Sequence, residues 1–156
     1  REQRSFLQMR NSRLQMLYQT VIKEHSTNQS NKRLIENPSG EMELFNPSCG
    51  DLVKVQYRLE DNEIVDMAFQ GEGCAISMAS ASMLTEIMLG KSSEEALELL
   101  SLFFEFMKGN EEIDTKPLDD AAYLQGVTKF PTRIRCATLS WHALEDGLLQ
   151  SDENSI

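Results

Sequence analysis

The sequence predicts an α+β domain in which a small antiparallel three-stranded sheet has helices packed on one of its faces. Between residues 42 and 70 apolar and polar side chains alternate, which is the period of a half-buried strand. Before residue 26 and after residue 74 the apolar positions recur every three to four residues, as in an amphipathic helix. Because the helices and strands occupy separate stretches of the chain, the pattern is typical of an α+β fold. With 156 residues, 40% of them hydrophobic, we expect a single domain over residues 12–150.

The N-terminal region predicts a tail, a helix and a loop. Residues 1–11 are polar and without period, so we expect a disordered tail or a cloning remnant. A helix is expected from Ser12, a suitable N-cap, to near His25, which we interpret as a surface residue compatible with the helix dipole and not as a metal ligand. The apolar positions of this helix are Leu14, Leu17, Tyr18, Val21 and Ile22. Residues 26–41 are rich in turn formers and predict a loop with at most a short extended piece.

Three strands are expected next. Apolar side chains occupy every second position from Val53 to Leu59 and again from Val65 to Phe69. The two runs are separated by the turn sequence EDNE, so they should pair as an antiparallel hairpin. Residues 41–45 are the expected third strand.

The C-terminal half predicts helices. Residues 76–87 carry an apolar stripe among small side chains that permit close packing, and Ser92 with Glu95 forms a capping box for a helix that reaches Met107. Residues 108–120 break the pattern, and a short helical piece is expected at 121–127. A last helix follows Pro131 and is expected to weaken at Gly147, before an acidic tail at 151–156. Its apolar stripe is Ala137, Trp141, Leu144 and Leu148.

The charge balance argues against two classes of partner. There are 15 Lys and Arg residues against 25 Asp and Glu residues, a formal net charge of -10. The resulting field repels phosphate backbones and anionic lipid, so we expect neither nucleic acid nor a membrane as a partner. No apolar run approaches the roughly 20 residues of a spanning helix, and the N-terminus lacks the apolar region of a signal peptide. We therefore expect a cytoplasmic protein.

The chain has three cysteines, Cys49, Cys74 and Cys136. An odd number spread far apart fits a disulfide framework badly. One interpretation is three small buried apolar side chains. The other is a functional trio, because Cys49 lies in a turn before a strand and the other two are expected at helix starts, where unpaired N–H groups favour the thiolate.

Asp51 supplies a fourth possible ligand. A turn can direct residues 49 and 51 toward one point, and the small Gly50 lets the backbone bend between them. Three thiolates and a carboxylate suit zinc or a small iron-sulfur unit. The alternative is that Asp51 caps its own turn. The cysteine spacing matches no paired-knuckle pattern, so residue chemistry alone indicates a metal or sulfur site.

Three blocks, NPSCGD, GEGCAISMASAS and RIRCATLSWHAL, resemble the signature blocks of the U-type iron-sulfur cluster assembly proteins, the family of IscU, the NifU N-terminal domain and SufU. The resemblance runs from about Leu14 to Leu148. By position it implies that Cys49, Cys74 and Cys136 are metal ligands, with Asp51 as the motif aspartate. Arg135 stands where the IscU branch has histidine, and the segment between Cys74 and Cys136 is longer; both features resemble the SufU branch.

The resemblance to SufU implies a zinc-bound sulfur acceptor that takes persulfide sulfur from a cysteine desulfurase. Cys49 falls on the acceptor position of that branch. The alternatives are a scaffold that builds a transient iron-sulfur cluster for apo iron-sulfur proteins, and a structural zinc module. The implied protein is a sulfurtransferase-like partner of the desulfurase and not a stand-alone enzyme. Arg135 is expected to support the negatively charged site or to remain in solvent, whereas His142 should point away from Cys136.

Overall fold

The computed structural model describes residues 16–28 and 30–154, with side chains as far as residue 150. The expected tail at 1–11, the Ser12 cap and Leu14 lie outside these residues. The first helix is described over residues 16–27 and ends close to the predicted position. After a loop that forms one isolated parallel bridge between Lys32 and Phe69, the strands and the remaining helices follow in the predicted order.

The sheet contains β1 (Gly40–Asn46), β2 (Asp51–Glu60) and β3 (Glu63–Glu72). All neighbours are antiparallel, in the order β1-β2-β3. The β2–β3 turn has positive φ at both of its central residues, Asp61 and Asn62. This backbone matches the twist of a two-residue hairpin, and Asp and Asn are among the residues that tolerate it. The predicted hairpin and the three-stranded sheet are confirmed.

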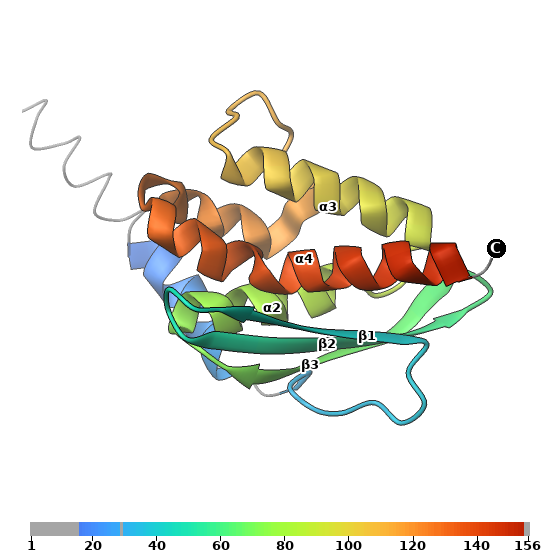
Figure 1. Cartoon of the computed structure of the whole chain (residues 1–156). Coiled ribbons are helices and arrows are strands. Elements are labelled where there is room, and N and C mark those ends of the chain that lie inside the picture. Colours follow the sequence, from blue (N-terminus) through green and yellow to red (C-terminus); the bar gives the residue numbers. More distant parts are fainter. Residues whose placement is uncertain (1–15, 29, 155–156) are drawn as a thin grey trace, which may run out of the picture.

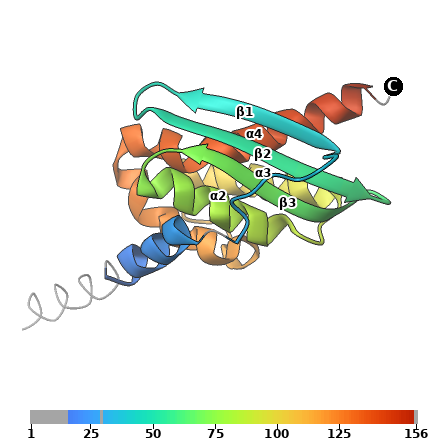
Figure 2. The ribbon, with the colours of Figure 1, turned by 90° about the horizontal axis from the view of Figure 1, so that it is seen from below.

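The helices cover one face of the sheet, as predicted (Figure 1). They are α2 (Ala75–Met88), α3 (Ser93–Met107), the 3-10 helix η1 (Lys116–Lys129) and α4 (Pro131–Asn154). Helices α2 and α4 lie directly on the strands, and α3 packs on α4 and η1. Figure 2 shows the other face of the sheet, crossed by the segment before β1. There the backbone N–H of Ile35 donates to Oε1 of the buried Gln56.

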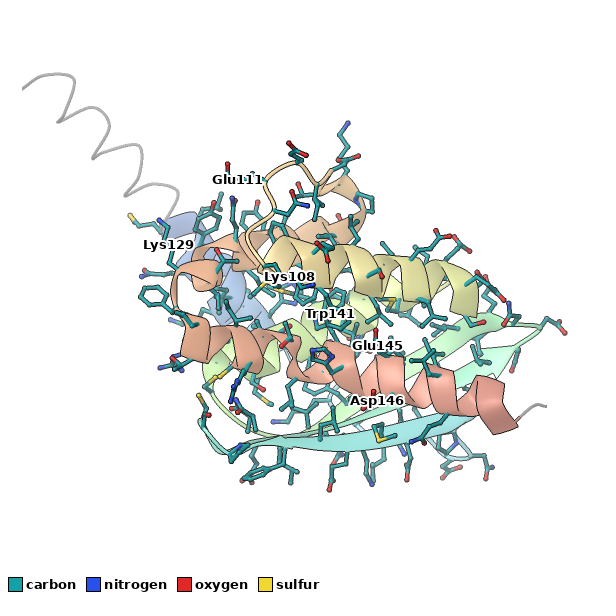
Figure 3. The ribbon with its side chains drawn as sticks, turned by 45° about the horizontal axis from the view of Figure 1, so that its top comes forward. Lys108, Glu111, Lys129, Trp141, Glu145 and Asp146 are labelled. Carbon is teal, nitrogen blue, oxygen red and sulfur yellow. The ribbon has the colours of Figure 1, made fainter. Side chains whose placement is uncertain are left out.

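Trp141 anchors the packing between the helices. It is fully buried and its ring stacks on Phe103, with 3.7 Å between ring centroids (Figure 3). The indole N–H donates to the Ser80 hydroxyl, and that hydroxyl donates to the carbonyl of Ala137. These contacts require close approach of α2 and α4, which the predicted stripe of small side chains in α2 allows.

Three details differ from the sequence-based expectations. Helix α4 continues through Gly147 to Asn154, so the expected boundary at residue 150 falls within it. A Cβ at Gly147 would lie 3.2 Å from the Tyr57 ring, so this glycine permits close packing of α4 on β2. The helical piece expected at 121–127 is part of the longer η1, which contains a kink at Asp119. His25 is buried, not on the surface, because Ser82 and Asp120 hydrogen-bond both of its ring nitrogens.

Candidate metal centre

The turn that carries Cys49 connects β1 to β2. Asn46 and Asp51 pair across the two strands and so fix the ends of the turn. The backbone N–H of Gly50 donates to the Asn46 carbonyl, and Gly50 has φ +71°, a conformation that glycine adopts without steric cost. Cys49 is half-buried between exposed neighbours. The turn therefore presents this thiol at the molecular surface while holding it beside the buried Asp51.

Asp51 is fully buried and both of its carboxylate oxygens are hydrogen-bonded. Oδ1 accepts from the backbone N–H of Cys74 at 2.9 Å, and Oδ2 accepts from Nδ2 of Asn46 at 3.1 Å. Gly73 makes room for it, since a Cβ at residue 73 would lie 2.5 Å from Oδ1. The carboxylate thus links the β1–β2 turn to the start of α2. The alternative that Asp51 only caps its own turn does not account for its hydrogen bond to Cys74.

Cys74 is the N-cap of α2, which confirms its predicted place at a helix start. Its Sγ accepts from the backbone N–H of Ser77 at 3.5 Å. Cys136 does not occupy such a place. It is the sixth residue of α4, fully buried in the second turn of the helix, because the helix already begins at Pro131. The expectation that a helix N-terminus favours the thiolate is therefore wrong for Cys136.

Three of the four expected ligands meet directly. One donor atom each from Cys49, Asp51 and Cys136 lies within 4.8 Å of the others, and the two Sγ atoms are 3.1 Å apart. Cys74 lies beside this trio, and its backbone N–H donates to Oδ1 of Asp51. Ligands of a tetrahedral zinc ion lie about 3.5–3.8 Å apart, given Zn–S bonds of about 2.3 Å and Zn–O bonds of about 2.0–2.2 Å. The two sulfurs would have to separate by about 0.4–0.7 Å to reach this spacing, and the soft donor set suits a zinc-sized ion.

The electrostatics of the cluster show what a cation would balance. Burial raises the pKa of Cys136 far above its usual range, and hydrogen bonds with Cys49, Asp51 and Cys74 add to this effect. Arg133 is exposed one helical turn earlier, and the nearby cysteine sulfurs, first Cys74 and then Cys49, raise the pKa of its guanidinium. Without a cation, burial disfavours the charged thiolate form of Cys136. Arg133 is a positively charged side chain beside the cluster.

Arg135, the expected supporting residue, is exposed, and its side chain makes no hydrogen bond or ion pair with any residue that the structure describes. Sequence reasoning missed Asn46, which contacts both Asp51 and the Cys136 sulfur, at 3.1 and 3.6 Å. Asn46 precedes Pro47 at the end of β1, and asparagine before proline commonly forms a turn, so the sequence did indicate a structural role for this residue. His142 stacks on Phe104 instead of facing a thiol, which confirms its expected direction.

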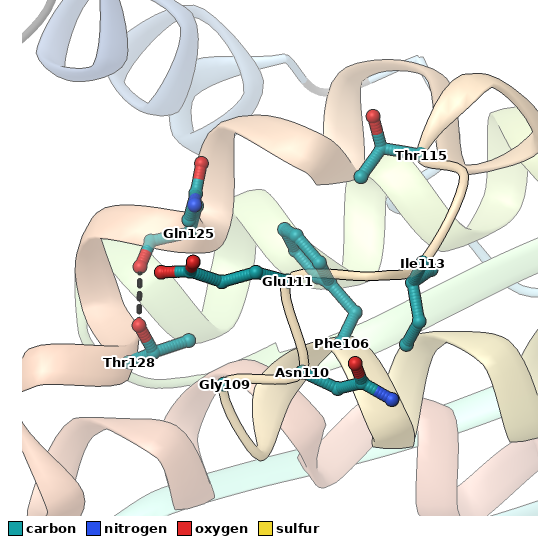
Figure 4. A pocket seen from close by; sticks show the side chains of 8 residues that line it. All are labelled: Phe106, Gly109, Asn110, Glu111, Ile113, Thr115, Gln125 and Thr128. Carbon is teal, nitrogen blue, oxygen red and sulfur yellow. Dashed lines mark hydrogen bonds between the residues drawn. The ribbon is translucent and has the colours of Figure 1, made fainter.

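A cavity of about 370 Å³ lies in the stretch between Cys74 and Cys136 (Figure 4). The end of α3, the following loop and η1 line it, and the Thr128 hydroxyl donates to the Gln125 carbonyl at its edge. Its lining residues include none of the four expected ligands. This cavity is therefore separate from the thiol cluster.

Three thiols and a buried carboxylate at one end of a small α+β domain are typical of proteins that bind a metal ion or transfer sulfur. A model of the family described as NifU-like N terminal domain matches residues 17–137. The chain belongs to this family. None of the helices in the described part of the chain is both long enough and apolar enough to cross a membrane.

Individual relatives agree with the family assignment. The chain is 45% identical to the zinc-dependent sulfurtransferase SufU of Bacillus subtilis, over 91% of this chain and 96% of that one. It is 41% identical to the iron-sulfur cluster assembly scaffold protein IscU of Streptococcus pyogenes, over 90% and 87%. The crystal structure of FiSufU from Fervidobacterium islandicum superposes with a TM-score of 0.77 at 35% identity, over 82% of this chain and 93% of that one.

Proposed function

We propose that this protein serves iron-sulfur cluster assembly as a zinc-bound sulfur acceptor, which takes sulfur from the persulfide of a cysteine desulfurase. The observation that carries this proposal is the meeting of Cys49, Asp51 and Cys136 within 4.8 Å, with Cys74 beside them. The similarity to a relative described as a zinc-dependent sulfurtransferase supports both the metal and the reaction. Because the donors come from the β1–β2 turn, β2, the start of α2 and α4, only the folded chain assembles them.

Zinc would be held by the thiolates of Cys49, Cys74 and Cys136 and by the carboxylate of Asp51. When bound, it keeps the thiols deprotonated at neutral pH, which their buried surroundings otherwise oppose. Three thiolates, one carboxylate and one divalent cation together carry a formal charge of about -2. Arg133 lies where it offsets part of this charge.

Cys49 is the sulfur acceptor in this proposal. Its thiolate attacks the outer sulfur of the partner's persulfide, so that a new S–S bond forms on Cys49 as the old S–S bond breaks. The electron pair of the broken bond leaves with the partner's cysteine as a thiolate. The outer sulfur moves without net oxidation or reduction, and Cys49 becomes a persulfide. Cys49 suits this role because it lies in a turn with exposed neighbours, whereas Cys136 is fully buried.

The proposed partners follow from this reaction. A cysteine desulfurase supplies the persulfide, and apo iron-sulfur proteins or other assembly factors receive the sulfur. The chain is then a sulfurtransferase-like partner of the desulfurase. We propose the cytoplasm as its location, since a reducing compartment keeps three cysteines free for metal binding.

A second candidate function is a scaffold on which an iron-sulfur cluster is built and passed on. The 41% identity to a scaffold protein supports it, and the same three thiols and carboxylate could bind cluster iron. A purely structural zinc module is the third possibility. A scaffold predicts a visible, transferable cluster after reconstitution, whereas a structural module predicts neither a cluster nor sulfur uptake.

The test combines elemental analysis with sulfur transfer. The purified protein is analysed for zinc and then mixed with a cysteine desulfurase and cysteine, and reductant-released sulfide is measured. We expect faster sulfide release and a mass increase of one sulfur atom on the peptide that contains Cys49. The Cys49→Ser variant should keep its fold by circular dichroism and lose both effects, while Ser48→Ala is the matched control in the same turn. Persulfide formation on another cysteine, or undiminished uptake by Cys49→Ser, would remove Cys49 from this role.

A further inference from the structure

A second cluster of metal-binding side chains shares no residue with the thiol site. One ligand atom each from His25, Glu86 and Asp120 lies within 4.8 Å of the others. They belong to three segments far apart in the sequence: the helix at 16–27, α2 and η1. Neither the family assignment nor the sulfur chemistry assigns a role to these residues.

The imidazole of His25 is held in a fixed orientation. Its side chain is buried, and Nδ1 lies 3.0 Å from the hydroxyl of Ser82, which is itself 1% exposed. Without a cation, Nε2–H donates to the Asp120 carboxylate and the Ser82 hydroxyl donates to Nδ1. In the other tautomer Nδ1–H donates to the same hydroxyl, and the Nε2 lone pair is then available to a cation held between the carboxylates. Metal-bound histidines are commonly oriented in this way, by a hydrogen bond from the ring nitrogen that does not bind the metal.

The distances match ligands around one small cation. Nε2 of His25 lies 2.8 Å from Oδ2 of Asp120 and 3.9 Å from Oε2 of Glu86. Metal–ligand bonds of about 2.0–2.1 Å place two ligands about 2.9 Å apart at a right angle and about 4.1 Å apart when opposite. Both carboxylates are about half exposed, at 47% and 51%, so small rotations can complete the geometry.

The local charge also favours a cation. Glu86, Asp119 and Asp120 line a cavity of about 190 Å³, which has room for water ligands. Among the described residues, no Lys or Arg forms an ion pair with any of these three carboxylates, although Asn28 donates to Oε1 of Glu86 at 3.3 Å. Within the described residues, the two carboxylates therefore face a buried imidazole, and no lysine or arginine is paired with either of them.

We propose that His25, Glu86 and Asp120 form a second metal site, which binds a first-row divalent cation and completes its shell with water. One imidazole nitrogen and two carboxylate oxygens suit Zn²⁺, Fe²⁺, Co²⁺ or Mn²⁺ better than Mg²⁺, which prefers oxygen alone. The bound cation would join the first helix, α2 and η1, so its binding stabilises the folded state by mass action.

Cobalt binding to protein that carries a single equivalent of zinc, bound at the cysteines, tests the proposal. We expect one equivalent of Co²⁺ by equilibrium dialysis, retained in millimolar Mg²⁺ and without a sulfur-to-cobalt absorption band. A strong sulfur-to-cobalt band would show that cobalt has replaced zinc at the cysteines. Cobalt bound there is subtracted before binding at the second site is calculated. The chain has only two histidines, so the paramagnetic ion should shift and broaden the ring NMR signals of His25 while those of His142 stay sharp.

Matched variants separate a built site from a general attraction to acidic groups. Glu86→Gln and Asp120→Asn keep the size of two exposed side chains, and each should weaken Co²⁺ binding by at least about tenfold. Asp119→Asn is the control, because Asp119 lines the same cavity but is not one of the three ligands. The proposal is overturned if no second equivalent binds, if both histidines broaden alike, or if Asp119→Asn weakens binding as much as the ligand variants. A hydrogen-bonded cluster that holds only a proton would give the first of these results.

Discussion

Gly73→Ala should disable the thiol site without altering any ligand. The backbone of Gly73 has an ordinary φ, so alanine meets only a steric obstacle. The new Cβ would lie 2.5 Å from Oδ1 of Asp51, whereas the tightest real Cβ contacts are 3.0–3.4 Å. The carboxylate must therefore move by 0.5 to 0.9 Å, the difference between these distances.

This movement weakens a specific hydrogen bond. Oδ1 accepts from the backbone N–H of Cys74, the residue next to Gly73, so moving away from residue 73 lengthens a bond that is now 2.9 Å. Movement along this bond lengthens it to about 3.4–3.8 Å, beyond the usual hydrogen-bond range. Loss of a buried bond to a charged group should lower the free energy of unfolding of the metal-free protein by about 1–3 kcal/mol. Displacing a ligand should weaken zinc binding by about 10- to 100-fold.

Competition with a chromophoric chelator measures the zinc affinity, and denaturant unfolding measures the stability. Gly126→Ala is the matched control, because its Cβ would meet nothing closer than 3.6 Å, at the Tyr18 ring. If Gly73→Ala binds zinc as tightly as the original protein and unfolds at the same denaturant concentration, Asp51 is neither held by this contact nor needed as a ligand.

Further predictions concern the core, the charge beside the thiols and the effect of pH. Trp141→Ala should lower the free energy of unfolding by about 3–5 kcal/mol, because it removes a fully buried indole together with its stacking on Phe103 and its hydrogen bond to Ser80. Denaturant unfolding followed by circular dichroism measures this change. Arg133→Gln should slow sulfur uptake more than Arg135→Gln, since of these two arginines Arg133 is the one that interacts with the cysteine sulfurs. Added salt should reduce the difference in uptake rate between the two variants. Equal uptake rates in the two variants would show that Arg133 does not assist the thiol site. In the metal-free protein the pKa of Cys136 is raised on folding, so its contribution to stability is complete below about pH 8.5 and is lost as the pH rises and the unfolded chain ionises. The free energy of unfolding should then fall by up to about 1.4 kcal/mol per pH unit, a decline that Cys136→Ser should reduce.

Several elements could be predicted because their causes are local. Ser92 and Glu95 are three residues apart, and their reciprocal hydrogen bonds form the capping box that begins α3. The β2–β3 hairpin depends on a two-residue turn between two alternating strands. In both cases the interacting groups are neighbours in the chain, so the sequence contains the whole signal.

The mistaken expectations involved distant partners. His25 was expected at the surface because its own helix gives no reason to bury it, whereas its partners lie 57 and 95 residues away. Cys136 was assigned to a helix start although the predicted helix already follows Pro131; what the sequence did not show is that the second turn of α4 packs against the β1–β2 turn and buries this thiol. Burial then reverses the expected direction of its pKa shift.

The sequence by itself determined the period of each strand and helix and the presence of three thiols and a nearby carboxylate, because backbone preference and side-chain chemistry belong to individual residues and their neighbours. Tertiary structure alone decided that Cys49, Asp51 and Cys136 meet and that Asn46 and Arg133 lie against them. The separation of residues 49 and 136 depends on how α4 packs over the sheet, and this packing is the outcome of the whole core.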